Sequence, residues 1–294
     1  MSKLHVLACL DSERMAQARQ QELQIRSDVA AALGRSAVKA AHEGFYLTKT
    51  GQAVVWRDAV QTACASKQSI APKSALPPNT GEPFEETTVQ VTNETTLGAA
   101  FRLVERGLQP IALNFANGVQ PGGGFLMGAR AQEEVLCRSS ALYQTLIGDP
   151  MYEEHWRRQL PDSTDWAIYS PKVPVFRMDD GTELECPRLL SFITCAAPYA
   201  PTVGQPQAGD LLRQRIHRLL GIAHAFGYSA LVLGAWGCGA FANDPRLTAL
   251  DFRHALEHKY EGAFSEVVFA IADWSQERRF LGPFRDVFAA NSSA

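Results

Sequence analysis

Short apolar blocks alternate with helical segments along the second half of the chain. Runs of apolar and β-branched residues favour buried strands, and such runs occupy residues 87–91, 110–115, 189–195, 230–233 and 266–271. Between them we expect a helix that opens at Asn93 or Thr96 and ends near Arg106, and helices at residues 131–146, 209–226, 245–258 and 276–289. The turn pair Asp180-Gly181 follows strand-like residues 173–178 and predicts an antiparallel hairpin. The alternation therefore predicts an α/β fold of three layers, α/β/α, with a mixed central sheet.

The first 84 residues follow a different pattern. There we expect a helix at residues 12–33, two strands within residues 44–56 that turn at Lys49-Thr50-Gly51, and a short helix through Ser66 that Asp58 caps. Prolines 72, 77, 78 and 83 then interrupt any regular element. This break predicts two parts: a mainly helical N-terminal extension, residues 1–84, packed on a core domain, residues 85–294.

The composition fits a globular chain. Its 294 residues are 46% hydrophobic, yet no apolar run approaches the roughly 18 residues that a membrane-spanning helix needs. The net charge of −3 argues against a protein that coats DNA or RNA by a general electrostatic grip. The composition therefore indicates neither a membrane partner nor a direct nucleic-acid partner.

The N-terminus and the cysteines both indicate a cytoplasmic chain. The apolar stretch near the N-terminus spans about seven residues, the lower bound of a signal-peptide core, and Asp11, Glu13 and Arg14 follow it directly. No two cysteines have the C-x-x-C spacing of a zinc knuckle or a redox motif. Scattered cysteines usually behave as small buried hydrophobic residues in a reducing compartment, and here they occupy positions 9, 64, 137, 186, 195 and 238.

A glycine-rich loop within residues 114–134 is the first candidate for a binding site. It contains Gly122-Gly123-Gly124 between a predicted buried strand and a predicted helix. Consecutive glycines let the backbone approach a ligand closely and direct several N–H groups at one point. A glycine triplet alone is more typical of a flexible turn. At the carboxyl end of a strand, where α/β sheets place their ligands, it predicts a phosphate or diphosphate site.

A second glycine-rich loop, residues 234–241, also follows an apolar strand and precedes a helix. Its glycines match neither the G-x-G-x-x-G pattern of dinucleotide-binding folds nor the Gly-Lys-Ser/Thr ending of the P-loop. The pattern therefore argues against hydride transfer with a dinucleotide and against ATP hydrolysis. Since Arg130 is the basic residue near the two loops, they predict a diphosphate held mainly by backbone N–H groups.

Two neighbouring carboxylates follow the first loop, in Gln132-Glu133-Glu134. Adjacent helical side chains point about 100° apart, so Glu133 and Glu134 cannot perform the same task. Acidic residues are common in the first turn of a helix, where the helix dipole favours them. A bound diphosphate would instead raise the pKa of a carboxyl group, which a general acid for glycosidic cleavage requires. The residues alone leave both interpretations open.

Other reactive residue types have simpler interpretations. His254 and His258 could share a helix face, but the segment lacks the H-E-x-x-H pattern of a zinc site. Cys238 lies in the second loop with no histidine fixed beside it, which favours a small residue in a tight turn over a nucleophile. Ser139 and Ser140 lack a G-x-S-x-G context. We therefore expect no metal ligands and no cofactor.

The two loops together resemble those of a known family. Gly122-Gly123-Gly124, then seven residues and Gln132-Glu133-Glu134, is similar to the signature of poly(ADP-ribose) glycohydrolases, specifically the compact bacterial type. The resemblance covers most of residues 85–290, and the N-terminal helical segment also resembles the appendage of the bacterial type. It implies a macrodomain, which is an α/β fold that binds ADP-ribose.

The resemblance implies a role for each matching residue. Glu134 would be the catalytic acid and base, while Glu133 and Asn117 would contact the ribose that is attacked. Phe269 or Trp274 could stack on the adenine base. The residues implied to bind the rest of the substrate are Gly122, Gly123, Gly124 and Gln132 on one side, and Gly237, Cys238, Gly239, Ala240 and Phe241 on the other, with Phe241 against the terminal ribose.

The implied reaction hydrolyses the ribose–ribose O-glycosidic bond of poly(ADP-ribose) and releases ADP-ribose, mainly from chain ends. Such a bond breaks through an oxocarbenium-like transition state. Glu134 would protonate the departing 2′-oxygen, and its carboxylate would then activate water. ADP-ribosylated proteins are the expected partners. Two alternatives stay open: a macrodomain that binds ADP-ribose without cleaving it, and a hydrolase that removes mono-ADP-ribose from proteins.

Overall fold

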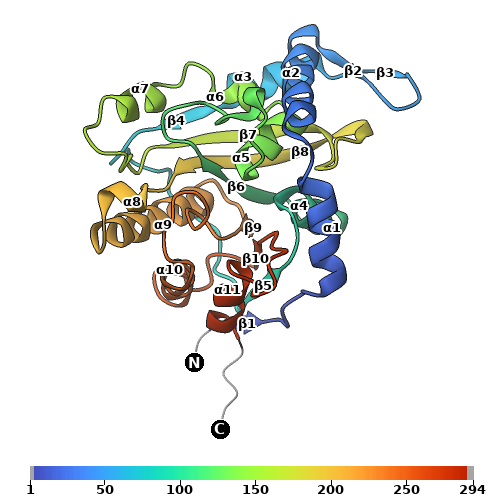
Figure 1. The fold of residues 1–294 in the computed structure, drawn as a ribbon. Coiled ribbons are helices and arrows are strands. Elements are labelled where there is room, and N and C mark those ends of the chain that lie inside the picture. Colours follow the sequence, from blue (N-terminus) through green and yellow to red (C-terminus); the bar gives the residue numbers. More distant parts are fainter. Residues whose placement is uncertain (1–2, 290–294) are drawn as a thin grey trace.

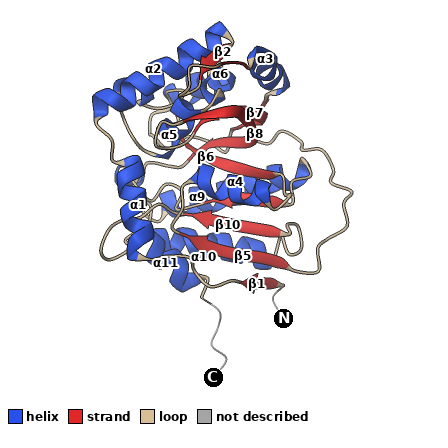
Figure 2. Ribbon diagram, turned by 90° about the vertical axis from the view of Figure 1, so that its right-hand side faces the viewer, coloured by secondary structure: helices blue, strands red, loops and turns tan. Residues whose placement is uncertain are grey.

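The computed structural model describes residues 3–289 and contains one mixed sheet of eight strands. Neighbouring strands run parallel from β1 as far as β8, and the last two strands run antiparallel to their neighbours. Figure 2 shows the sheet from β7 at the top to β1 at the bottom. The strand order is β1 (Leu4–Val6), β5 (Thr87–Thr92), β10 (Glu266–Ala270), β9 (Ala230–Leu233), β6 (Pro110–Ala116), β8 (Glu183–Ala196), β7 (Ala167–Arg177) and β4 (Gln68–Ile70).

Helices cover both faces of the sheet (Figure 1). One face packs against α9 (Gln207–Ala225), α10 (Pro245–Glu257) and α11 (Leu281–Val287). The other packs against α2 (Ser27–Glu43), α3 (Arg57–Ser66), α4 (Thr96–Glu105), α5 (Gln132–Ser139) and α6 (Leu142–Leu146). The shorter or more peripheral helices are α1 (Glu13–Leu23), the 3₁₀ turn η1 (Phe125–Met127), α7 (Pro150–Trp156) and α8 (Ala200–Val203). Within residues 3–289 no helix is long and apolar enough to cross a membrane.

Alternation of side chains along the strands produces the two apolar layers. Successive residues of a strand point to opposite faces of the sheet. On β9, Leu231 and Leu233 pack with α9, α10 and α11, whereas Val232 between them packs with the helices of the other face. Strands β6 and β10 repeat this division. The predicted three-layer α/β/α fold with a mixed central sheet is confirmed.

Two of the predicted helices are each interrupted by a tertiary contact or a turn. The helix expected at residues 12–33 is divided into α1 and α2, because the backbone at Arg26 is extended (ψ 147°). The helix expected at residues 131–146 stops at Ser139, since Ser140 bridges to Val175 of β7 and Ala141 donates its N–H to a β7 carbonyl. Helix propensity does not report such contacts.

Smaller differences occur at single positions. The helix that starts at Arg57 has Trp56 as its N-cap without a side-chain hydrogen bond, so the prediction that Asp58 caps it was wrong. The final helix begins at Leu281, five positions later than residue 276. The hairpin expected within residues 44–56 is present as β2 (Phe45–Leu47) and β3 (Ala53–Val55).

Residues 3–84 pair with the rest of the chain through the sheet. Strand β1 lies parallel to β5 at one edge, and β4 lies antiparallel to β7 at the other edge. Neither edge strand was expected, because three-residue strands carry little periodic signal. Residues 3–84 therefore complete the sheet at both edges rather than standing apart from it.

Candidate active site

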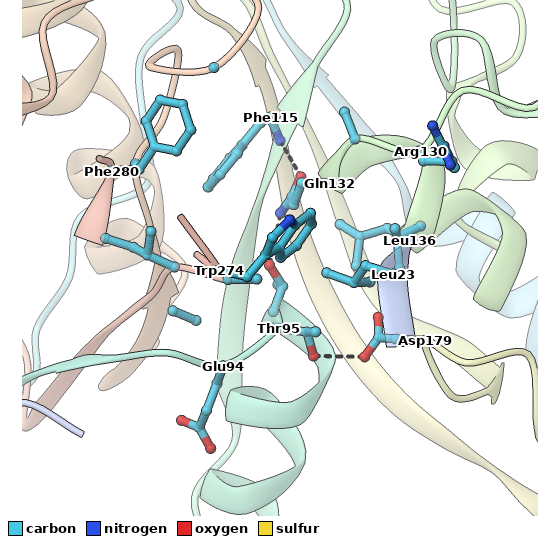
Figure 3. Close-up of a pocket in the computed structure, with 18 residues that line it drawn as sticks. Leu23, Glu94, Thr95, Phe115, Arg130, Gln132, Leu136, Asp179, Trp274 and Phe280 are labelled. Carbon is cyan, nitrogen blue, oxygen red and sulfur yellow. Dashed lines mark hydrogen bonds between the residues drawn. The ribbon is translucent and has the colours of Figure 1, made fainter. Parts of the chain in front are cut away.

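Two adjoining cavities lie at the ends of the parallel strands. The carboxylate cavity, of about 250 Å³, is lined by residues that include Asn117, Glu133 and Glu134, and by Trp236, Gly237 and residues 239–241 of the second glycine-rich loop, but not by Cys238. The aromatic cavity, of about 260 Å³, is lined by residues that include Leu23, Phe115, Trp274 and Phe280 (Figure 3). The carboxyl ends of parallel strands are where α/β sheets bind their ligands, so both cavities lie at an expected position. They form one elongated site because they share Phe115, Ala131, Gln132, Ala235 and Gly239.

Glu134 lies in the first turn of α5 and lines the carboxylate cavity. Its Oε1 atom accepts a hydrogen bond from the N–H of Gly124 at 3.0 Å. Its Oε2 atom is buried and has no partner among the described residues. An unpaired buried oxygen costs free energy, because it has lost its hydrogen bonds to water and gained none from the protein.

Glu133 is held from two sides and is only 3% exposed. Its Oε2 atom accepts from the N–H of Asn117 at 2.7 Å, and its Oε1 atom accepts from Nδ2 of Asn114 at 3.2 Å. Burial raises the pKa of Glu133 to about 8, although both hydrogen bonds oppose that shift, and the nearby Glu134 carboxylate adds to it. The two glutamates therefore have different partners: Glu133 is engaged through both oxygens, and Glu134 through one.

The glycine triplet forms the turn behind these carboxylates. Gly122 and Gly123 have φ angles of 70° and 56°, which side chains rarely allow. The N–H groups of Gly123 and Gly124 already donate to Gln120 O and to Glu134, and the triplet does not line either cavity. In this structure the triplet positions the side chain of Glu134. Its contact with a diphosphate stays a prediction.

The second glycine-rich loop offers free backbone donors. Within residues 3–289, the N–H groups of Gly239, Ala240 and Phe241 donate to no protein acceptor. A Cβ added to Gly239 would meet no atom within 4 Å, so the backbone there is open to a ligand. Gly237 has a φ of 75° and lies against Ala197, and it shapes the turn. Consecutive backbone donors of this kind form a concavity that suits an anion.

Cys238 packs inside this loop. Its Sγ atom lies 3.5 Å from the carbonyl oxygen of Trp236 and 3.6 Å from Oγ1 of Thr248, and the residue is 4% exposed. Burial raises the pKa of its thiol to about 12. Because the thiolate is the reactive form, this cysteine is not set up as a nucleophile near neutral pH.

Asn117 and Gln132 connect the first loop to the sheet. Oδ1 of Asn117 accepts two backbone N–H groups of its own turn, and its Nδ2 donates to no described residue. Gln132 accepts the N–H of Phe115 at 2.9 Å and donates to Thr96 Oγ1 and Leu113 O. The amide of Gln132 thus links β6 to α4, while Asn117 keeps a free donor at the cavity.

Phe269 does not reach the site. Its side chain has no exposed surface and packs among Phe252, Phe284 and Phe288. The expectation that it stacks on a base was therefore wrong, because its position on β10 points it into the core. Trp274, the other candidate, is 39% exposed and lines the aromatic cavity.

The aromatic cavity also has acidic groups on its lining. Glu94 receives hydrogen bonds from Arg102 on both carboxylate oxygens. Asp179 is 1% exposed and accepts the hydroxyl of Thr95 at 2.7 Å (Figure 3). Burial raises the pKa of Asp179 to about 7. The cavity therefore combines flat apolar walls with hydrogen-bond acceptors, as ligand pockets commonly do.

His155 supports the site without a signal in the sequence. It accepts the N–H of Thr164 at Nε2, so its Nδ1 carries the proton and donates to Gly118 O at 3.0 Å. Burial lowers the pKa of His155 to about 4, which keeps the ring neutral. The histidine therefore fixes the turn beside Asn117, although 37 positions separate it from Gly118.

The remaining candidates lie elsewhere. His254 of α10 and His258, the residue that follows this helix, stack on each other with ring centroids 4.2 Å apart, and neither lines a cavity of this site. Among residues 3–289, no group of three or more His, Cys, Asp or Glu side chains is arranged to hold a metal ion.

Comparisons with known proteins identify relatives of the chain. The family described as "microbial-type PARG, catalytic domain" matches residues 34–178. The chain is 38% identical to poly(ADP-ribose) glycohydrolase from Thermomonospora curvata, with a TM-score of 0.82, covering 88% of this chain and 99% of that one. It is 40% identical to the enzyme from Deinococcus radiodurans solved with ADP-ribose, with a TM-score of 0.71, covering 78% of this chain and 97% of that one. No curated protein sequence matched.

The fold and the site define an α/β glycohydrolase of the macrodomain type. At these levels of identity and coverage, the chain belongs to the microbial-type poly(ADP-ribose) glycohydrolase family.

Proposed function

We propose that the carboxylate cavity binds the terminal ADP-ribose unit of poly(ADP-ribose) and that Glu134 is the acid and base of its hydrolysis. The observation that carries this assignment is Oε2 of Glu134, a buried oxygen with no partner among the described residues, on a side chain that lines the cavity. The relatives support the ligand, since the Thermomonospora curvata enzyme was solved with the inhibitor ADP-HPD and the Deinococcus radiodurans enzyme with ADP-ribose.

A single carboxyl group can both give the proton that the reaction needs and take one back. Protonated Glu134 gives its proton to the departing 2′-oxygen of the neighbouring ribose as the bond from the anomeric carbon to that oxygen breaks. The resulting oxocarbenium ion is stabilised by the adjacent diphosphate and by the Glu134 carboxylate. Water then attacks the anomeric carbon and gives a proton to Glu134, which restores the acid.

Neighbouring residues would position the reacting ribose. The free Nδ2 of Asn117 can donate to a ribose oxygen, and the Glu133 carboxyl, protonated near neutral pH, can both donate to and accept from ribose hydroxyls beside its present bonds. Because Glu133 is fixed by Asn117 and Asn114, it presents these groups in one orientation. Such positioning lowers the entropy cost of reaching the transition state.

The rest of the ligand would extend into the aromatic cavity. The free N–H groups of Gly239, Ala240 and Phe241 lie at the cavity and are suited to the diphosphate. Gly239 lines both cavities, so a diphosphate held there leads directly from one to the other. Trp274 and Phe280 then offer aromatic surfaces for the adenine base.

We further propose release mainly from chain ends, with ADP-ribosylated proteins as the cellular substrates in the cytoplasm. The walls of the aromatic cavity support the first point, because Leu23, Trp274 and Phe280 line the adenosine end of the site. The six free cysteines support a reducing compartment. The net charge of −3 fits capture of one terminal unit by backbone N–H groups, without a general grip on nucleic acid.

The test separates this activity from its alternatives. The protein is incubated with end-labelled poly(ADP-ribose) and, separately, with mono-ADP-ribosylated protein, and the products are resolved by chromatography. We expect free ADP-ribose from the polymer from the earliest times and little release from the mono-modified protein. Early oligomers would contradict cleavage from chain ends. Binding of ADP-ribose without release from the polymer would instead indicate a non-catalytic reader.

A further inference from the structure

The loop of residues 273–281 builds one wall of the aromatic cavity, because it carries Trp274 and Phe280. Asp273 organises this loop from within. Its Oδ1 accepts the N–H and the hydroxyl of Ser275, and its Oδ2 accepts the N–H groups of Phe280 and Leu281. Although burial raises it, these hydrogen bonds hold the pKa of Asp273 below its usual range. The loop is therefore closed on itself around one carboxylate.

The N-terminal segment is hydrogen-bonded to the same loop, because Asn93 links Asp11 to Asp273. Asn93 is fully buried and donates from Nδ2 to Asp273 O at 2.7 Å and to Asp11 Oδ1 at 2.8 Å. Its Oδ1 accepts the N–H of Asp273 at 3.0 Å. Asn93 thus joins the start of the loop to Asp11, and Leu10 beside it bridges to Thr92 at the end of β5.

Arg278 makes a second, charged connection. Its guanidinium, 8% exposed, donates to Asp11 Oδ2 at 2.8 Å, to Glu13 Oε1 at 2.8 Å and to Ser275 O at 2.5 Å. The backbone at Arg278 has a φ of 50°, a strained value for a residue with a side chain. The pair with Asp11, whose side chain is 16% exposed, is shielded from water and holds a conformation more strongly than the pair with the exposed Glu13.

The same N-terminal segment also reaches the cavity itself. Helix α1 begins directly after Asp11 and Ser12, and Leu23 at its last position lines the aromatic cavity opposite the loop (Figure 3). Residues 3–23 lie outside residues 34–178, the part that matches the family's catalytic domain. An element outside the matched region therefore contributes both a wall and an anchor to the site.

We propose that residues 3–23 form a strap that fixes the aromatic wall of the ligand site, with Asp11 and Arg278 as positioning residues for Trp274 and Phe280. The proposal rests on the assignment of the aromatic cavity to the adenosine end of the substrate. When the strap is intact, the wall is preorganised and the ligand does not have to order it. Loosening the strap then weakens binding of adenine-containing ligands and leaves the chemistry at Glu134 unchanged.

The experiment compares three substitutions in the full chain: Asp11→Asn, Arg278→Lys and Glu13→Gln. Asp11→Asn keeps the oxygen that Asn93 binds but removes the charge that faces Arg278. Asp28→Asn is the matched control, because it makes the same change of Asp to Asn and Asp28 forms an exposed pair with Arg26 just after the strap. The readouts are Kd values for ADP-ribose and AMP by calorimetry, KM and kcat with polymer, and thermal unfolding.

For Asp11→Asn we expect KM and both Kd values to rise about five- to tenfold while kcat stays within about twofold, the pattern of lost ground-state binding. Arg278→Lys, which keeps the charge, should raise KM and the Kd values less than Asp11→Asn does. Asp28→Asn should match the unmodified protein. Lower thermal stability with unchanged Kd values would show a purely structural strap and overturn the proposal.

Two further outcomes are also decisive. If Asp11→Asn fails to fold, Glu13→Gln takes its place, since Glu13 is 80% exposed and its loss removes a single ion pair. We then expect Kd for ADP-ribose to rise about twofold, and no change would overturn the proposal. Failure of the unmodified protein to bind ADP-ribose would contradict the proposed function itself, whereas equal binding by the unmodified protein and Asp11→Asn would contradict only the strap.

Discussion

Gly123 lies so close to Glu134 that a side chain at position 123 would displace the carboxylate. A Cβ built on Gly123 would stand 2.3 Å from Oε1 and 3.1 Å from Cδ of Glu134, and 3.2 Å from Oε2 of Glu133. The same residue has a φ of 56°. The glycine triplet and the two glutamates are therefore parts of one steric unit, in which the turn determines where the carboxylates stand.

Replacing Gly123 with Ala should displace Glu134 and strain the turn. Because misplacing a reacting group by about 1 Å can cost on the order of a hundredfold, we expect kcat to fall by about that factor. The positive φ should lower the free energy of unfolding by about 1–3 kcal/mol. Gly282→Ala is the control, since its Cβ would keep contacts of 3.6 Å or more. Full activity in Gly123→Ala, measured with polymer, would refute this relation.

Trp274 and Phe269 should respond in opposite ways to substitution. Stacking of an aromatic side chain on a base is worth about 1–3 kcal/mol, so Trp274→Ala should weaken ADP-ribose binding about tenfold or more, and Trp274→Phe should weaken it less. Phe269→Leu should lower thermal stability and leave Kd unchanged, because Phe269 lies wholly in the core. Calorimetry and thermal unfolding on the three variants check this. Weaker ADP-ribose binding in a stable Phe269→Leu variant would show that Phe269 does contribute to the binding site.

Glu133 should make the protein less stable as the pH rises. Its pKa is about 8 in the folded protein and near 4.5 when unperturbed, so between these values the folded state holds a proton that the unfolded chain has released. The stabilising contribution is complete below the unfolded pKa and is lost as the pH rises through the folded one. The difference in unfolding free energy between the unmodified protein and Glu133→Gln should change by about 2 kcal/mol between pH 5 and pH 7.

Urea unfolding of both proteins at several pH values measures this difference. Asp179, whose pKa is also raised by burial, is present in both and cancels in the comparison. Parallel stability curves for the two proteins across this range would show that Glu133 is ionised in the folded state.

The sequence predicts the layers of this fold better than its edges. Strands β6 and β9 could be predicted because each is a run of apolar residues that alternates its side chains between two packed faces. Strands β1 and β4 each have three residues, and only pairing with a distant neighbour makes them strands. Likewise, the break after Ser139 depends on contacts with β7 that no local propensity contains.

The sequence likewise predicts some residues of the site and misses others. Glu133, Glu134 and Asn117 line one cavity with the second glycine-rich loop, as their sequence motifs led us to expect. His155 and Arg278 act through partners 37 and 267 positions away, and nothing near them in the sequence indicates those partners. Phe269 lies within β10, whose two faces are both packed, whereas Trp274 lies in the loop after the strand. The sequence alone does not show which of the two reaches the cavity.

The most direct test of the account is the conversion of Glu134 to Gln. The substitution keeps the size of the side chain and an oxygen for the N–H of Gly124, and it removes the proton that the reaction transfers. We predict that Glu134→Gln binds ADP-ribose within about threefold of the unmodified protein, while release of ADP-ribose from labelled polymer falls by about a thousandfold or more. Cleavage at an undiminished rate, with binding intact, would contradict the assignment of Glu134 as the acid and base.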